Sequence, residues 1–267
     1  MRFHFPALAT ALALAAISLP AQQPQQQQQQ AGPHPKSQKE VDALKKVQAD
    51  QQAQNWDAEI TDINFVLENF ADTEYKNMLL AMAVQAAQNK GDYAQEIAFG
   101  EQAIQADPNN AEPYIKVAET VAAHIRENDL NKEDELKKVD TNARKGLDVL
   151  KTASTPPEGI AADQWPAYKK QLEGQAHDAL GMADAAAKKL PEAIDEYKAA
   201  LAAYSNPIIL THMAKAYIDG KQYDDAIAAD DKVLAMSDAP ANVKQFAQEQ
   251  KDTATKMKGA ASAASPK

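Results

Sequence analysis

The 267-residue chain contains no cysteine, so disulfide bridges, thiol nucleophiles and zinc–thiolate sites are excluded. Aromatic residues make up only 6% of the chain, and its nine glycines form no glycine-rich phosphate loop. Alanine is visibly the favoured residue, and small side chains suit helices that pack closely against each other. We therefore expect stability to come from helix packing alone.

Basic residues are fewer than acidic ones. The chain has 28 Lys and Arg against 38 Asp and Glu residues, a formal net charge of −10, and no basic stripe. Phosphate backbones and anionic lipid surfaces select basic proteins, so nucleic acid and membrane surfaces are disfavoured as partners.

The chain lacks an apolar run long enough to span a bilayer comfortably. Its longest run, residues 7–19, follows the positive charge of Arg2 and precedes small residues that suit cleavage. This pattern predicts a signal peptide over residues 1–21, with an uncleaved anchor as the alternative. An exported protein is expected, in the periplasm of a Gram-negative bacterium or secreted.

Residues 22–38 are rich in glutamine and proline, a composition that cannot bury a core. We expect a disordered linker there and a second disordered segment at residues 259–267.

The remaining sequence repeats one helical pattern. Residues 91–110 contain a turn, an amphipathic helix and a second turn, and the same pattern returns in residues 188–207 and 220–240. Ile194 and Ile227 occupy equivalent places 33 residues apart. Each of these helices follows another helix, so the unit is a helix pair.

This unit resembles the tetratricopeptide repeat (TPR), which has small and aromatic residues at fixed offsets. The pair that starts at Gly174 fits well, with Gly181, Ala193, Tyr197 and Ala200 at the family's positions. The copies that start at Asn77 and Pro207 depart from the pattern. Glu96 replaces the alanine, and Gly100 and Asp230 replace the aromatic, leaving gaps for neighbouring side chains to fill.

The resemblance implies an all-α fold, a right-handed α-solenoid of stacked antiparallel helix pairs. Small residues would let helices approach, and large ones would fill the layer between them. The predicted repeats cover about residues 39–73 (degenerate), 77–110, 111–151 (degenerate), 174–206 and 207–240, with a proline-rich insertion at 152–166 and a capping helix at 241–258.

Trp165 stands in the proline-rich insertion. It is interpreted either as part of a lid that packs on the adjacent helices or as an exposed anchor for a partner.

No residue pattern indicates catalysis. Every serine falls in the signal, linker, turns or tail. His177 and His212 sit at different repeat offsets, which favours satisfied or surface histidines over a metal pair. Four acids cluster in one helix and are interpreted as a solvated face; they are Asp224, Asp225, Asp230 and Asp231. We expect no enzyme, metal or cofactor.

The family's ligand-contacting positions predict a groove on the first helices of the repeats. The residues at these positions are Met78, Ala81, Gln85, Gln88, Asn89, Glu112, Ile115, Glu119, Gln175, Asp178, Met182, Ala185, Ala186, Ile208, Thr211, Lys215, Ile218 and Asp219. Such a mixed, mildly apolar surface suits an extended peptide or a partner's helix.

The resemblance thus implies a non-catalytic protein–protein interaction scaffold of the bacterial envelope. Two alternatives stay open: a self-associating structural protein of the envelope, and a hydrolase of cell-wall glycan that uses the acidic cluster. The identity of the partner, the cellular process and the oligomeric state are not fixed by these residues.

Overall fold

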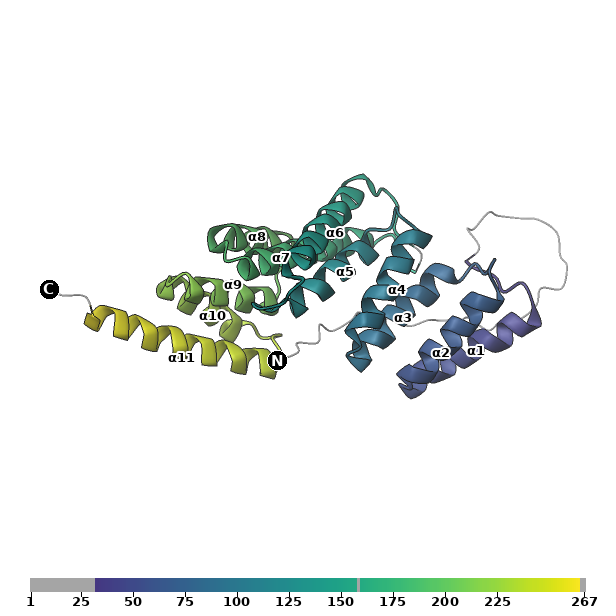
Figure 1. Ribbon diagram of the computed structural model, residues 1–267, viewed down its shortest axis with the longest axis horizontal. Coiled ribbons are helices and arrows are strands. Elements are labelled where there is room, and N and C mark those ends of the chain that lie inside the picture. The colour runs from purple at the N-terminus through teal and green to yellow at the C-terminus, as the bar shows by residue number, and fades with distance from the viewer. Residues whose placement is uncertain (1–31, 158, 265–267) are drawn as a thin grey trace. The chain divides into compact units, whose positions relative to one another are not determined.

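The computed structural model describes residues 32–157 and 159–264, and regular structure within them is entirely helical (Figure 1). The predicted signal peptide and most of the linker lie outside the described residues. The helices are α1 (Gln38–Ala53), α2 (Trp56–Asn69), α3 (Lys76–Lys90), α4 (Tyr93–Ala106), α5 (Ala111–His124), α6 (Lys132–Thr152), α7 (Trp165–Ala186), α8 (Leu190–Ala203), α9 (Pro207–Asp219), α10 (Tyr223–Ala235) and α11 (Ala241–Ala264).

The helices pack mainly against their neighbours in the sequence, which confirms the predicted all-α solenoid of helix pairs. The chain divides into two compact units, with the boundary inside α4. Unit 1 holds the described residues up to 99 together with 156–161, and unit 2 holds 100–155 with the described residues from 162 onward.

Side-chain caps and prolines determine where several helices begin. The side chains of Ser37, Asn110 and Asn206 accept hydrogen bonds from backbone N–H groups at the start of α1, α5 and α9. Proline stands in the first turn of α7, α8 and α9, where its missing N–H costs nothing. Gly91 ends α3 with a φ of 69°, a conformation that side chains disfavour.

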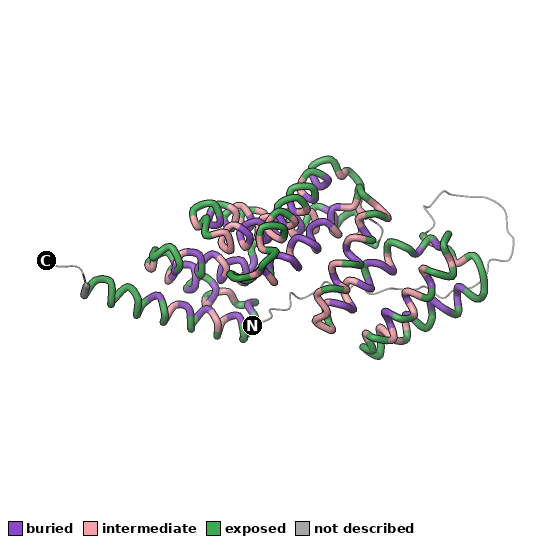
Figure 2. Tube along the Cα trace, in the orientation of Figure 1, coloured by how far each residue is buried: buried purple, intermediate pink, exposed green. Residues whose placement is uncertain are grey.

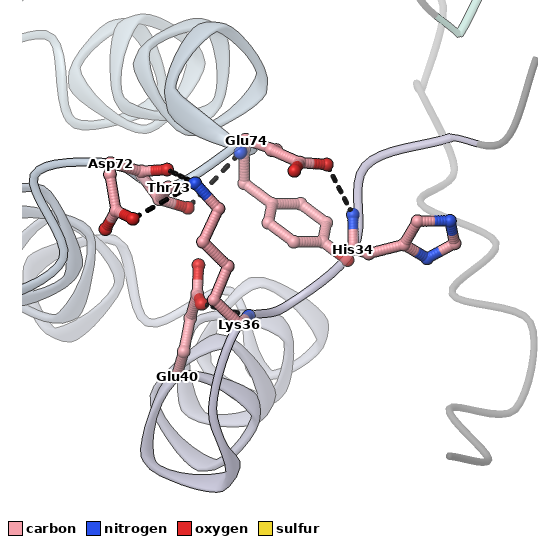
Figure 3. A network of polar contacts seen from close by, with 7 residues as sticks. His34, Lys36, Glu40, Asp72, Thr73 and Glu74 are labelled. Carbon is pink, nitrogen blue, oxygen red and sulfur yellow. Dashed lines mark hydrogen bonds and ion pairs between the residues drawn. The ribbon is translucent and has the colours of Figure 1, made fainter. Parts of the chain in front are cut away.

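In unit 1, the segment just before α1 is bonded to the turn between α2 and α3 (Figure 3). The His34 backbone N–H donates to Glu74 Oε2 at 3.0 Å, and Lys36 Nζ donates to Asp72 Oδ2 at 3.1 Å. The Tyr75 hydroxyl donates to the Pro33 carbonyl at 2.8 Å. Residues 33–37 belong to the predicted linker, and these polar contacts fix its end to the helical array.

Close approaches between helices in unit 2 depend on glycine. A Cβ atom on Gly181 of α7 would lie 2.6 Å from the Tyr197 ring of α8, and one on Gly100 would lie 2.6 Å from Val117 Cγ2. The predicted packing of small against large residues is confirmed, and Val117 fills the space beside Gly100. Buried residues recur between exposed ones along α11 (Figure 2), whereas α9 is buried along most of its length.

Trp165 is buried, with 8% of its surface exposed, at the start of α7. Its ring lies 6.3 Å from that of Tyr168, and Lys169 Nζ lies 5.7 Å from its centroid. This placement supports the lid interpretation over an exposed anchor.

The last helix, α11, continues to Ala264, beyond the predicted end at residue 258. No helix among the described residues is both long and apolar enough to span a membrane.

Candidate functional site

The first helices of the repeats in unit 2 follow one another in space. Helix α7 contacts α5 on one side and α9 on the other, and α9 also contacts α11. The predicted groove residues of α5, α7 and α9 therefore lie on helices that contact one another in turn. Those of α3 lie in unit 1.

The chain itself covers part of the predicted groove. Six of its residues in unit 2 are buried: Ile115, Gln175, Asp178, Ile208, Thr211 and Ile218. The residues that keep accessible surface there are Glu112, Glu119, Met182, Ala185, Ala186, Lys215 and Asp219. A partner would touch this second set, so the accessible surface is narrower than the predicted groove.

On α3, the accessible surface is rich in side-chain amides. Gln85 Nε2 donates to Gln88 Oε1 at 3.1 Å and to Asn89 Oδ1 at 3.2 Å. Met78 is half-buried and Ala81 is exposed on the same helix. Amides both donate and accept hydrogen bonds, and here they bond to one another along the helix.

A buried ion pair joins α7 to α9. His212 Nδ1 of α9 lies 2.9 Å from Asp178 Oδ1 and 3.2 Å from Oδ2, and Asp178 is only 1% exposed. Burial lowers the pKa of His212, but the charge of Asp178 and its hydrogen bond raise it more, so the net pKa lies above 6.5. The pair therefore holds adjacent repeats together while His212 is protonated.

The neighbouring residue His177 binds a different helix. Its Nδ1 lies 2.6 Å from Glu196 Oε2 of α8. Both histidines thus have carboxylate partners, which confirms their interpretation as satisfied histidines. Sequence reasoning placed Asp178 in the groove and missed its bond to His212, although the 34-residue separation, one repeat length, indicates such contacts.

The interpretation of the acidic cluster of α10 as a solvated face is wrong for Asp230. Asp224, Asp225 and Asp231 are exposed, whereas Asp230 is 0% exposed. Burial, and secondly the charge of Asp231, raise the pKa of Asp230 to about 7. Asp230 occupies the repeat's aromatic position, which faces the interior whatever residue it holds.

Unit 1 contains a buried carboxyl group whose pKa is raised in the same direction. Glu59 of α2 is 1% exposed, and burial, followed by the charge of Asp50, raises its pKa to about 7. In the described part of the chain, no three His, Asp or Glu side chains are grouped to hold a metal ion.

Comparisons with known proteins agree with this architecture. The chain is similar to TTC0263, a thermophilic TPR protein of Thermus thermophilus, with 16% identity, a TM-score of 0.57, and coverage of 79% of this chain and 98% of that one. The chain has the TPR fold. The TPR array is also similar to PilW, a widely conserved type IV pilus biogenesis factor, with 14% identity, a TM-score of 0.55, and coverage of 85% and 94% respectively. No family model and no curated protein matches the TPR chain by sequence.

Proposed function

We propose that this TPR protein is a non-catalytic scaffold that binds an extended peptide or a helix of another protein. The carrying observation is the accessible face of α5, α7 and α9, where apolar side chains stand beside charged ones. Met182 and Ala186 are four residues apart on α7 and so share one face of that helix, and the Lys215–Asp219 ion pair occupies the equivalent repeat positions on α9, 33 residues later. This combination suits a partner segment with both apolar and polar groups.

The groove is best tested with substitutions that leave the core intact. Gln175 and Asp178 are buried, so changing them would disturb folding as well as binding. A variant with Met182→Glu and Ala186→Glu adds charge and bulk to the accessible face of α7. The matched control, Lys198→Glu with Ala202→Glu, has the same spacing on exposed positions of α8.

Crosslinking followed by pull-down from intact cells measures the outcome. We expect the α7 variant to lose the partners that the wild-type chain and the α8 control recover. Equal recovery of the same partners by all three proteins would contradict binding at this face.

Export to the bacterial envelope is the second part of the proposal. Its support is the charged start and short apolar run of residues 1–21, which lie outside the described residues. Cell fractionation with N-terminal sequencing tests it: we expect a mature chain in the periplasm that begins near residue 22. Retention of the full-length chain in the cytoplasm would contradict export.

A further inference from the structure

Asp230 is a buried carboxyl group without a hydrogen-bond partner. Neither Oδ1 nor Oδ2 has a hydrogen-bonding neighbour among the residues that the structure describes, and the residue is fully buried. Helix α10 packs against α9 and α11, and Asp230 lies one turn after Ala226, which packs with Ile218 of α9 and Ala254 of α11. Burying an ionised carboxylate without compensating bonds is strongly unfavourable, whereas a protonated carboxyl group costs much less.

Among the described residues, no Lys, Arg or His side chain forms an ion pair with Asp230. On α11, Lys251 binds the adjacent Asp231, with Nζ 2.6 Å from Oδ1. On α9, His212 binds Asp178 of α7. The Lys215 and Asp219 side chains of α9 bind each other, with Nζ 2.5 Å from Oδ1.

Three influences thus act on the pKa of Asp230: two disfavour its charged form, and a weaker one favours it. Burial and the charge of Asp231 raise its pKa, and the charge of Lys251 lowers it by less, which gives a value of about 7. The carboxyl group therefore changes its charge near neutral pH.

Helix α11 is the last described helix of the array. Ala254 packs against Ile218 and Ala226, and Gln250 Nε2 donates to the Thr211 carbonyl at 3.2 Å. In a solenoid a terminal element contacts only its neighbours, so it can open without unfolding the other repeats. A change in the charge of Asp230 should therefore act most directly on the packing of α11 against α9 and α10.

We propose that α11 is a detachable cap, held on α9 and α10 when Asp230 carries a proton and released when Asp230 is ionised. Release exposes the apolar surface around Ile218 and Ala226 at the end of the array. The direction follows from proton binding: the attached state holds the proton more tightly than the open state. Attachment is therefore strongest below about pH 4, weakens as the pH rises to about 7, and is constant above that value.

Hydrogen exchange of the full chain, followed by mass spectrometry and corrected for the intrinsic pH dependence of exchange, tests this proposal. Between about pH 5 and pH 8 we expect protection of residues 241–254 to fall at least tenfold. Asp230→Asn keeps the shape and removes the titration, so protection of α11 in this variant should not change with pH.

Two matched controls locate the effect. Glu59→Gln removes a buried acid of unit 1 whose pKa is also raised to about 7, and it should leave the pH dependence of α11 as it is. Asp231→Asn breaks the bond to Lys251 but keeps the buried acid, so the dependence on pH should persist. Two results would overturn the proposal: α11 protection that is independent of pH in the wild-type chain, or a pH dependence that survives in Asp230→Asn.

Discussion

Two adjacent helix pairs of unit 2, α7–α8 and α9–α10, share one register but hold different chemistry in it. Tyr197 of α8 packs against Gly181, whereas 33 residues later Asp230 and Ala214 occupy the equivalent positions. Ala214 carries the Cβ atom that Gly181 lacks, so less room is left for an aromatic ring. Asp230 is smaller than tyrosine and fits the reduced space, but its carboxyl group is buried there.

The side-chain contact between α7 and α9 also differs from the one between α9 and α11. Asp178 and His212 form an ion pair between α7 and α9, while a neutral hydrogen bond from Gln250 to the Thr211 carbonyl joins α11 to α9. The comparison shows that neighbouring repeats with the same backbone can hold an ion pair, a neutral hydrogen bond or a buried titratable acid. Four substitutions test how far each contact matters.

The largest effect is expected from Asp178→Asn. It leaves His212 without its carboxylate and should lower the free energy of unfolding of unit 2 by about 3 kcal/mol at pH 6. Because the pKa of His212 is raised in the fold, the ion pair stabilises fully below the unfolded pKa of about 6.5 and less as the pH rises through the folded pKa. A double-mutant cycle with His212→Gln in urea at pH 6 and pH 9 measures this. Equal coupling at both values would contradict the assignment.

Gly181→Ala should destabilise unit 2 by about 2 kcal/mol, because its Cβ would overlap the buried Tyr197 ring. The substitution imitates the α9–α10 pair, where alanine already stands at this position. Thermal unfolding followed by circular dichroism gives the effect. In a Tyr197→Leu background the same change should cost little, and an undiminished cost there would exclude the ring as the cause.

Asp230→Leu should act in the opposite direction and stabilise unit 2 by about 2 kcal/mol at pH 8. The gain should shrink as the pH falls to about 4, where the carboxyl group is protonated in the folded wild-type chain and begins to be protonated in the unfolded chain as well. Urea unfolding at several pH values measures the difference. A gain that is equal at pH 4 and pH 8 would show that packing alone causes it.

The smallest effect is expected at the surface of α9. Lys215→Ala breaks an exposed ion pair with Asp219, one turn along the same helix, and should change the free energy of unfolding by less than about 0.5 kcal/mol. Denaturant melts of this variant and the wild-type chain provide the measurement. A loss above about 1 kcal/mol would mean that Lys215 has a role in folding beyond this pair.

The sequence predicts the helix pairs well because their signals are local and periodic. Gly181, Ala193, Tyr197 and Ala200 mark the α7–α8 pair by spacing alone, and the structure confirms that pair. The burial of Asp230 was missed because a carboxylate normally indicates a solvent-exposed position, and only the repeat register places it inside.

Contacts between distant residues were less accessible to sequence reasoning. The bonds that fix residues 33–37 to the turn after α2 join residues about 40 positions apart, without a repeat to reveal them. The groove was predicted from family positions, which do not say that Gln175 or Thr211 is covered by its own chain. The identity of these side chains alone does not determine how deeply neighbouring helices enclose them.

The adjacent residues His177 and Asp178 bind α8 and α9 respectively, so two bonds at one level of α7 restrain its rotation about its own axis. The accessible Met182 and Ala186 lie one to two turns farther along the same helix. Their orientation is therefore set by contacts within the chain. Under the proposed function, this face would lose little conformational entropy on association, and most of the entropic cost of forming a complex would fall on the ligand.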